Sequence, residues 1–66
     1  MRYMVIIERS PQGYGAYVPD LPGCIAVADT EEEVRRLIQE AIEFHLEGLK
    51  EEGKEIPAPR SYGEFV

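Results

Sequence analysis

The sequence has little of what catalysis and membrane anchoring require. It contains one cysteine and one histidine, so it can form no internal disulfide and has no His/Cys cluster with metal-ligand spacing. The longest apolar run near its start is the five-residue Tyr3–Ile7, far short of the roughly 20 residues that span a bilayer. Glu8 and Arg9 follow too soon for a secretory signal. We therefore expect a soluble cytoplasmic protein with no metal, no cofactor and no catalytic residue.

Basic residues are also scarce. Thirteen acidic residues against seven Lys and Arg give a net charge of −6, which disfavours direct binding to nucleic acid. An acidic chain suits a basic protein partner better, although acidity also keeps small proteins soluble. The composition, 44% hydrophobic and 30% charged, is that of a globular protein. We expect residues 1–66 to form one domain, whose core is marginal because a chain this small buries only roughly 60% of its unfolded surface.

Three short apolar segments come first. Arg2 to Glu8 is apolar on both faces, which predicts a strand with something packed on each side. Tyr14 to Val18 and Cys24 to Ala28 are predicted as the second and third strands. A tight turn at Ser10–Gly13 joins the first two strands, and the segment Pro19–Gly23 joins the second to the third. The two prolines of this segment have no backbone N–H to donate to a neighbouring strand, so the segment does not form a strand. The pattern predicts an antiparallel meander.

A helix pattern follows the strands. Thr30 and Glu33 have the spacing of a capping box, and Gly53 is a natural stop, which predicts a helix over about residues 31–52. Apolar residues at three- and four-residue spacing give this helix one buried face. They are Val34, Leu37, Ile38, Ala41, Ile42, Leu46 and Leu49.

The predicted fold class is therefore α+β: a three-stranded antiparallel β-sheet packed on one helix, in the order β-β-β-α. Ser61–Val66 is a candidate for a fourth short strand. One helix covers only one face of such a sheet, and apolar surface left in water commonly marks an interface. We therefore expect a homo-oligomer, at least a dimer, with Met4, Ile6 and Tyr17 on the opposite face as candidate interface residues.

The residues whose side chains could take part in catalysis or bind a metal also have purely structural interpretations. His45 lies within the apolar stripe, where it is either a general base or pH switch or, more simply, a neutral imidazole packed against the sheet. Cys24 is interpreted as a small buried hydrophobe. Asp20 and Asp29 are the only aspartates, and both fall in loops. A metal-dependent nuclease needs several carboxylates converging on one point, so a two-metal site is not expected.

Four segments carry a resemblance to a known family. They are Tyr3–Glu8, Gly13–Cys24 with its Val-Pro-Asp-Leu-Pro-Gly-Cys run, Asp29-Thr30 with Glu33, and Ile56–Pro59. In residue types and spacing the chain closely resembles the HicB antitoxin-like family, over nearly its whole length. The resemblance implies a truncated ribonuclease-H-like fold that has lost its catalytic carboxylates. Ala28 stands where the family often has glycine.

The resemblance also implies a function. Typical members neutralise a small basic mRNA-cleaving toxin of the HicA type by covering its active-site histidine. Many carry a C-terminal DNA-binding segment, which we do not expect here because the chain stops at Val66. Two alternatives stay open: a stand-alone oligomeric protein with another protein or small-molecule ligand, and a residual nuclease.

The Pro19–Gly23 loop is the most specific part of the resemblance. We expect Pro19, Pro22 and Gly23 to shape the chain there, as Thr30 and Glu33 shape the start of the helix. Asp20 and Leu21 are expected to be exposed and are the candidate contacts for a partner. With the candidate interface residues named above, these five structural residues and two contact residues are the site predictions that the sequence supports.

Overall fold

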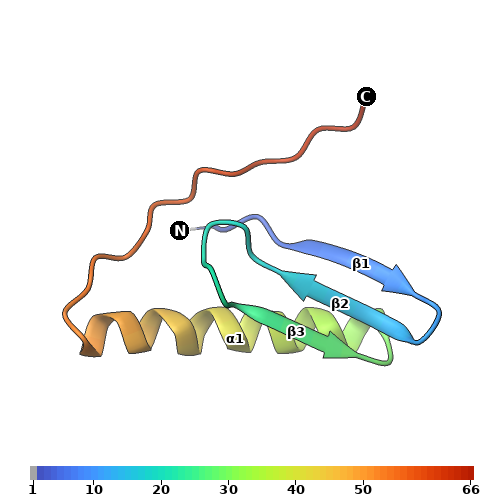
Figure 1. The fold of residues 1–66 in the computed structure, drawn as a ribbon, viewed down its shortest axis with the longest axis horizontal. Coiled ribbons are helices and arrows are strands. Elements are labelled where there is room, and N and C mark those ends of the chain that lie inside the picture. Colours follow the sequence, from blue (N-terminus) through green and yellow to red (C-terminus); the bar gives the residue numbers. More distant parts are fainter. Residues whose placement is uncertain (1) are drawn as a thin grey trace.

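The computed structural model describes residues 2–66 and shows three strands followed by one helix (Figure 1). Strands β1 (Ile6–Ser10), β2 (Gly13–Tyr17) and β3 (Ile25–Ala28) form one antiparallel sheet in the order β1-β2-β3. Helix α1 (Glu31–Glu51) packs on one face of this sheet. The predicted α+β class and the β-β-β-α order are confirmed.

A tight hairpin joins β1 to β2. Ser10 pairs with Gly13, so only Pro11 and Gln12 form the turn. Gly13 has φ of +145°, and a Cβ there would lie 2.6 Å from the carbonyl oxygen of Ala28. Any side chain would therefore collide with the backbone at the end of β3, which explains a glycine at this position.

The first strand does not have its predicted limits. The sequence predicts Arg2 to Glu8, whereas β1 begins four residues later and continues to the hairpin. Ile6 pairs with Tyr17, the last residue of β2, and the chain turns away soon afterwards at Pro19. Residues 2–5 consequently have no strand beside them with which to pair. The limits of a strand depend on its partner as well as on its own pattern.

Both ends of α1 carry the caps that the sequence predicts. The Thr30 hydroxyl accepts a hydrogen bond from the N–H of Glu33 at 3.1 Å. At the other end Gly53 has φ of +69°, and its N–H donates to the carbonyl of Lys50. The next N–H donates to the carbonyl of Leu49, which completes a Schellman motif. The helix ends within one residue of its predicted limit because this glycine adopts a left-handed conformation.

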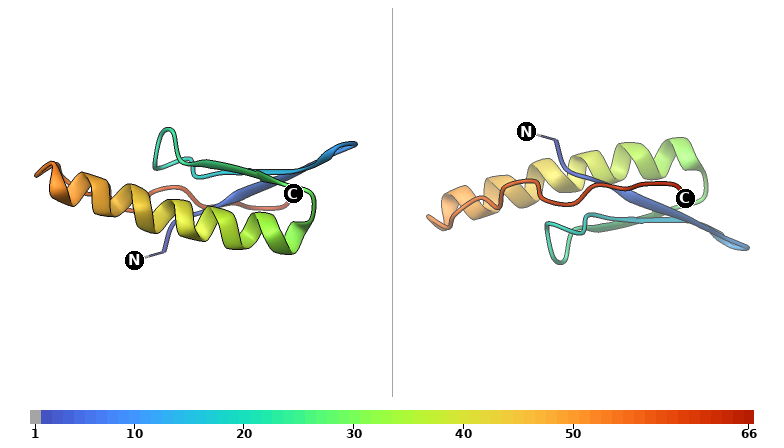
Figure 2. Two further views of the ribbon diagram at one scale, coloured as in Figure 1. Left: turned by 90° about the horizontal axis from the view of Figure 1, so that it is seen from below. Right: turned by 90° about the horizontal axis from the view of Figure 1, so that it is seen from above.

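The core lies between α1 and one face of the sheet. α1 lies on one side of the sheet (Figure 2), over β3 and β2 and not over β1 (Figure 1). The buried residues come from β2, from α1 and from the segment between β2 and β3: Ala16, Val18, Leu21, Cys24, Val34 and Ile38. The opposite face of the sheet, here called the open face, has no layer on it among residues 2–66.

The chain after α1 is extended but not a strand. The predicted strand Ser61–Val66 is wrong, because this segment pairs with no strand of the sheet within residues 2–66. It is held by side chains instead, as described below. Among the described residues, no helix combines the length and the apolar composition needed to cross a membrane.

The packing predicts that truncating Ile38, a core residue of α1, strongly lowers the stability of the fold. Ile38 is buried between α1 and the sheet. Replacing Ile38 by Ala should lower the free energy of unfolding by roughly 2–5 kcal/mol, measured by urea denaturation, because large-to-small core changes leave a cavity. Gln39→Ala, at the adjacent exposed position, is the control and should change it by less than about 0.5 kcal/mol.

Candidate functional site

The β2–β3 loop consists of two consecutive turns that share one residue. The N–H of Leu21 donates to the carbonyl of Val18 at 3.0 Å, and the N–H of Cys24 donates to the carbonyl of Leu21 at 3.1 Å. In the second turn Pro22 is followed by Gly23 with φ of +86°, the arrangement of a type II turn. Proline and glycine are thus required here by backbone geometry.

Leu21, where the two turns meet, is fully buried. Its exposed fraction is 0%, and it packs in the core with residues of the sheet and of α1. The expectation that Leu21 is exposed is therefore wrong. The second turn reverses the chain just after Leu21 and directs the side chain inward, where burying a leucine contributes roughly 1.5–3 kcal/mol.

Asp20, the neighbouring residue, holds the segment that follows α1. One carboxylate oxygen accepts hydrogen bonds from the N–H groups of Arg60 at 2.7 Å and of Ser61 at 2.8 Å. The other oxygen accepts from the Ser61 hydroxyl at 2.8 Å. A single side chain thus joins two segments that lie 40 residues apart in the sequence.

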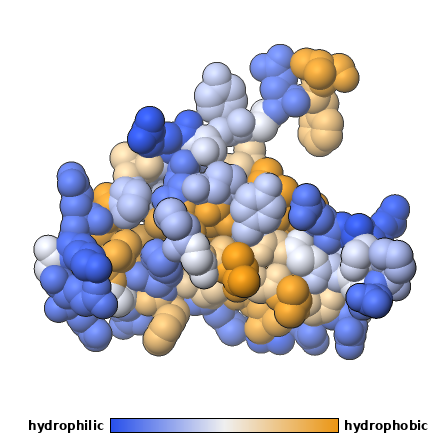
Figure 3. Space-filling model, in the orientation of Figure 1, coloured by the Kyte–Doolittle hydropathy of each residue, from blue (hydrophilic) through white to orange (hydrophobic). Residues whose placement is uncertain are grey.

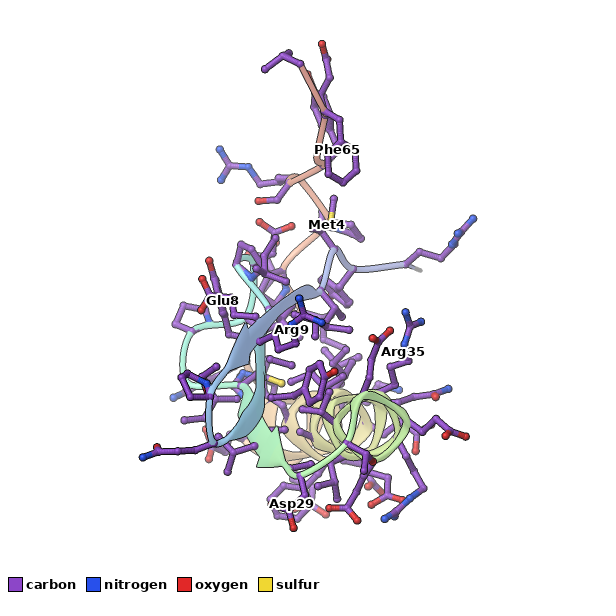
Figure 4. All side chains as sticks on the ribbon, turned by 90° about the vertical axis from the view of Figure 1, so that its right-hand side faces the viewer. Met4, Glu8, Arg9, Asp29, Arg35 and Phe65 are labelled. Carbon is purple, nitrogen blue, oxygen red and sulfur yellow. The ribbon has the colours of Figure 1, made fainter. Side chains whose placement is uncertain are left out.

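Two further contacts hold the same segment. The Tyr3 hydroxyl donates a hydrogen bond to the carbonyl of Pro57, and the Met4 side chain lies against Gly63. Residues 57–63 therefore lie against the start of the chain and the β2–β3 loop. Beyond them Phe65 extends past Met4, clear of the sheet and of α1 (Figure 4).

The hydrogen bonds at Asp20 also affect its ionisation. The backbone N–H of Ser61, the backbone N–H of Arg60 and the hydroxyl of Ser61 favour the carboxylate, in that order, and lower the pKa of Asp20 below 3.8. The carboxylate that holds residues 60–61 is therefore charged at every physiological pH.

The other residues that could take part in catalysis or bind a metal lie apart from one another in the fold. Cys24 is buried, and burial raises the pKa of its thiol, so the nucleophilic thiolate does not form at neutral pH. His45 is half-buried on α1. Asp29 precedes α1, at the opposite end of β3 from Asp20. Within residues 2–66, no three His, Cys, Asp or Glu side chains converge in a way that could hold a metal ion.

The open face of the sheet carries an apolar surface over β2 and β3 (Figure 3). Ile6, Tyr17 and Ile25 are neighbours in one row across the three strands. Met4 and Ile6 are half-buried and Tyr17 is 40% exposed, whereas Ile25 and Val27 are 68% and 76% exposed. The sequence analysis proposed Met4, Ile6 and Tyr17 as candidate interface residues but did not include the residues of β3. The pattern that could have identified the residues of β3 is the predicted third strand, which is apolar on both faces.

The outward surface of α1 is acidic. The helix contains seven glutamates and three basic residues. Two of the glutamates pair with arginines, Glu31 with Arg35 and Glu40 with Arg36. Among those that form no ion pair within residues 2–66, three recur every four residues on the face opposite the core. These three, Glu43, Glu47 and Glu51, are here called the acidic ridge.

Comparison with known proteins agrees with the motifs. The family described as "HicB_like antitoxin of bacterial toxin-antitoxin system" matches residues 3–66. Antitoxin HicB 2 of Photorhabdus laumondii is 34% identical over 64 residues, which are 97% of this chain and 46% of that protein. An uncharacterised 14.9 kDa protein of Haemophilus phage HP1 is 38% identical over 66 residues, which are 100% of this chain and 50% of that protein. The chain thus spans about half the length of these two relatives.

Other relatives are shorter, and one solved structure is similar. A UPF0150 protein of Helicobacter pylori is 44% identical over 45 residues, covering 68% of this chain and 62% of that protein. A chain of a HicA3 and HicB3 toxin-antitoxin complex superposes with a TM-score of 0.74 at 30% identity. The superposition covers 89% of this chain and 70% of that one.

Removing the charge of Asp20 should release the segment after α1. In Asp20→Asn the side chain loses the charge that strengthens these hydrogen bonds, so the amides of Arg60 and Ser61 should exchange with deuterium faster, as measured by NMR. Asp29→Asn changes the only other aspartate and should leave both amides unchanged. In the unaltered chain both amides should stay protected through the pH range in which an ordinary aspartate becomes protonated and lose protection only at lower pH, because the hydrogen bonds lower the pKa of Asp20. Equal exchange in Asp20→Asn and in the unaltered chain would contradict this role.

Proposed function

Because the chain belongs to the HicB-like antitoxin family, we propose that it is an antitoxin-type binding module that neutralises a small basic toxin. In this proposal the toxin is an mRNA-cleaving protein of the HicA type, and the chain acts by covering the active site of the toxin. The chain contributes a binding surface, and its partner contributes the chemistry.

The observation that carries the proposal is the structural likeness to a chain of the HicA3 and HicB3 complex. The match includes 89% of this chain at 30% identity, so it extends over the sheet, the loop and the helix together. A fold alone does not define a function. Here the fold coincides with the residue pattern of the β2–β3 loop and with the match of residues 3–66 to the antitoxin family.

The charge distribution supports a basic partner and suggests where it binds. Glu43, Glu47 and Glu51 extend over two turns of α1, or about 12 Å along the helix axis. Like charges at this spacing act jointly on an approaching basic surface, because the screening length is about 8 Å at physiological salt. Such a field increases association rates with oppositely charged partners. Asp20 remains a candidate contact, although its carboxylate already holds residues 60–61.

The proposal is tested with the small basic protein that we expect to be encoded beside this gene. Co-expression should relieve growth arrest caused by that protein, and the two purified proteins should form a complex detectable by surface plasmon resonance. Reversing charges on the acidic ridge in Glu43→Lys/Glu47→Lys should lower the association rate about tenfold or more at low salt, and less at high salt.

A matched control separates the ridge from net charge. Glu55→Lys/Glu64→Lys makes the same change in charge at exposed positions outside α1 and should leave the rate within about twofold. Equal losses in the two double variants would show that only net charge matters. A neighbouring basic protein that neither arrests growth nor binds this chain would overturn the proposed function itself.

A further inference from the structure

An apolar groove lies between β1 and α1, on the side of the sheet that the helix covers. It is present because α1 lies over β2 and β3 and leaves the inner side of β1 uncovered. The groove has a volume of about 440 Å³, and Arg35 and Gln39 line it together with four apolar side chains. These four are Val5, Ile7, Ile38 and Ile42. The groove is here called the β1 groove.

One end of the β1 groove is basic. Arg9 of β1 and Arg35 of α1 line an adjoining hollow together with Ile7, Tyr14 and Glu31. Figure 4 looks onto this end and labels both arginines, one on the strand and one on the helix. Arg35 pairs with Glu31, whereas Arg9 forms no ion pair within residues 2–66. An acidic occupant therefore gains from the charge of this end, and a basic occupant does not.

β1 is also an edge strand with unused backbone groups. No strand lies beyond it among residues 2–66. The N–H of Val18 donates to β3, and in an antiparallel ladder every second residue faces the same neighbour. Tyr17 therefore faces β1, and its partner Ile6 faces β2, so the backbone groups of Ile7 and Arg9 face outward. An exposed edge of this kind is a template for pairing with another strand, which indicates an extended occupant.

The chain itself contains a segment with these properties. Residues 64–66, here called the tip, combine one carboxylate, Glu64, with the apolar residues Phe65 and Val66. Both apolar side chains are fully exposed, and Phe65 extends clear of the sheet and of α1 (Figure 4). The hydrogen bonds to Asp20 anchor the chain just before the tip. Valine and phenylalanine favour strands, so the tip suits pairing with a strand edge.

We propose that the tip of one copy of this chain pairs with β1 of a second copy and fills the β1 groove there. In Figure 1 the tip runs in the same direction as β1 of its own chain, so a two-fold axis across the strands makes it antiparallel to β1 of the other copy. Opposite residues of an antiparallel pair point to the same face. The register that satisfies the charges places Glu64 opposite Arg9 and Val66 opposite Ile7.

This register gives each residue of the tip a place. Val66 enters the apolar part of the β1 groove, and Glu64 lies at its basic end. Phe65 points to the open face by alternation, diagonal to Ile6, a separation that an aromatic side chain bridges. Both apolar residues of the tip thus leave water, which favours association.

Composition favours a second copy as the source of the occupant. Each chain has one groove and one tip, so the exchange is reciprocal and closes as a dimer. A basic partner would meet the unpaired Arg9 in the groove, whereas it is attracted to the acidic ridge. The contact includes no residue of the acidic ridge, so it is independent of toxin binding.

The test is an isotope-filtered NMR experiment on an equal mixture of ¹³C-labelled and unlabelled full-length chain. Nuclear Overhauser effects should connect the methyl groups of Val66 in one copy with those of Ile7 and Ile42 in the other. The Ile42 methyl shifts should depend on concentration and give the dissociation constant. Val66→Ser should raise that constant about tenfold, because it removes the apolar side chain. Val66 is exposed in the single chain, so circular dichroism should show the fold unchanged.

A charge exchange makes the outcome specific. Arg9→Glu and Glu64→Lys should each raise the dissociation constant about two- to fivefold, and the double variant should restore much of the loss, because it reverses the ion pair. Glu55→Lys makes the same change in charge at an exposed position outside the tip and should have little effect. Overhauser effects found only within one copy, or found nowhere, would overturn the proposal. So would a double variant no tighter than either single variant, and none of these results bears on toxin binding.

Discussion

The two consecutive turns between β2 and β3 determine how the rest of this small molecule is held. They place two adjacent residues on opposite sides of the backbone: Leu21 enters the core, and Asp20 binds the backbone of residues 60–61. The turns also set the end of β2, and with it the start of β1, because strands pair only where both are present. The specific Val-Pro-Asp-Leu-Pro-Gly-Cys run is thus explained by geometry before any partner is considered.

A second constraint is that one helix covers part of a three-stranded sheet. α1 lies over β2 and β3, which leaves the open face and the β3 edge without a second layer among residues 2–66. A chain of 66 residues buries only a small hydrophobic core, so the apolar residues that remain outside the core are a large share of its apolar surface. Exposed Ile25, Val27 and Phe44 bury little of their apolar surface in the single chain and therefore contribute little to its folding.

The sequence predicted those features that depend on local rules. The cap at Thr30, the stop at Gly53 and the apolar face of α1 follow from spacing within one helix. The limits of β1, the burial of Leu21 and the attachment of residues 57–63 depend on contacts between distant segments, which no local pattern encodes. Proline and aspartate in a loop usually indicate a turn, and here the same aspartate also accepts three long-range hydrogen bonds.

Helix α1 carries different residues on two of its faces. Its apolar stripe packs on β2 and β3, whereas the acidic ridge lies on the side that faces solvent, about half a turn away. A substitution on the ridge therefore leaves the core contacts of α1 in place. The proposed binding of a basic partner can consequently be weakened by changes on the ridge without loss of the fold, because the two faces share no side chain.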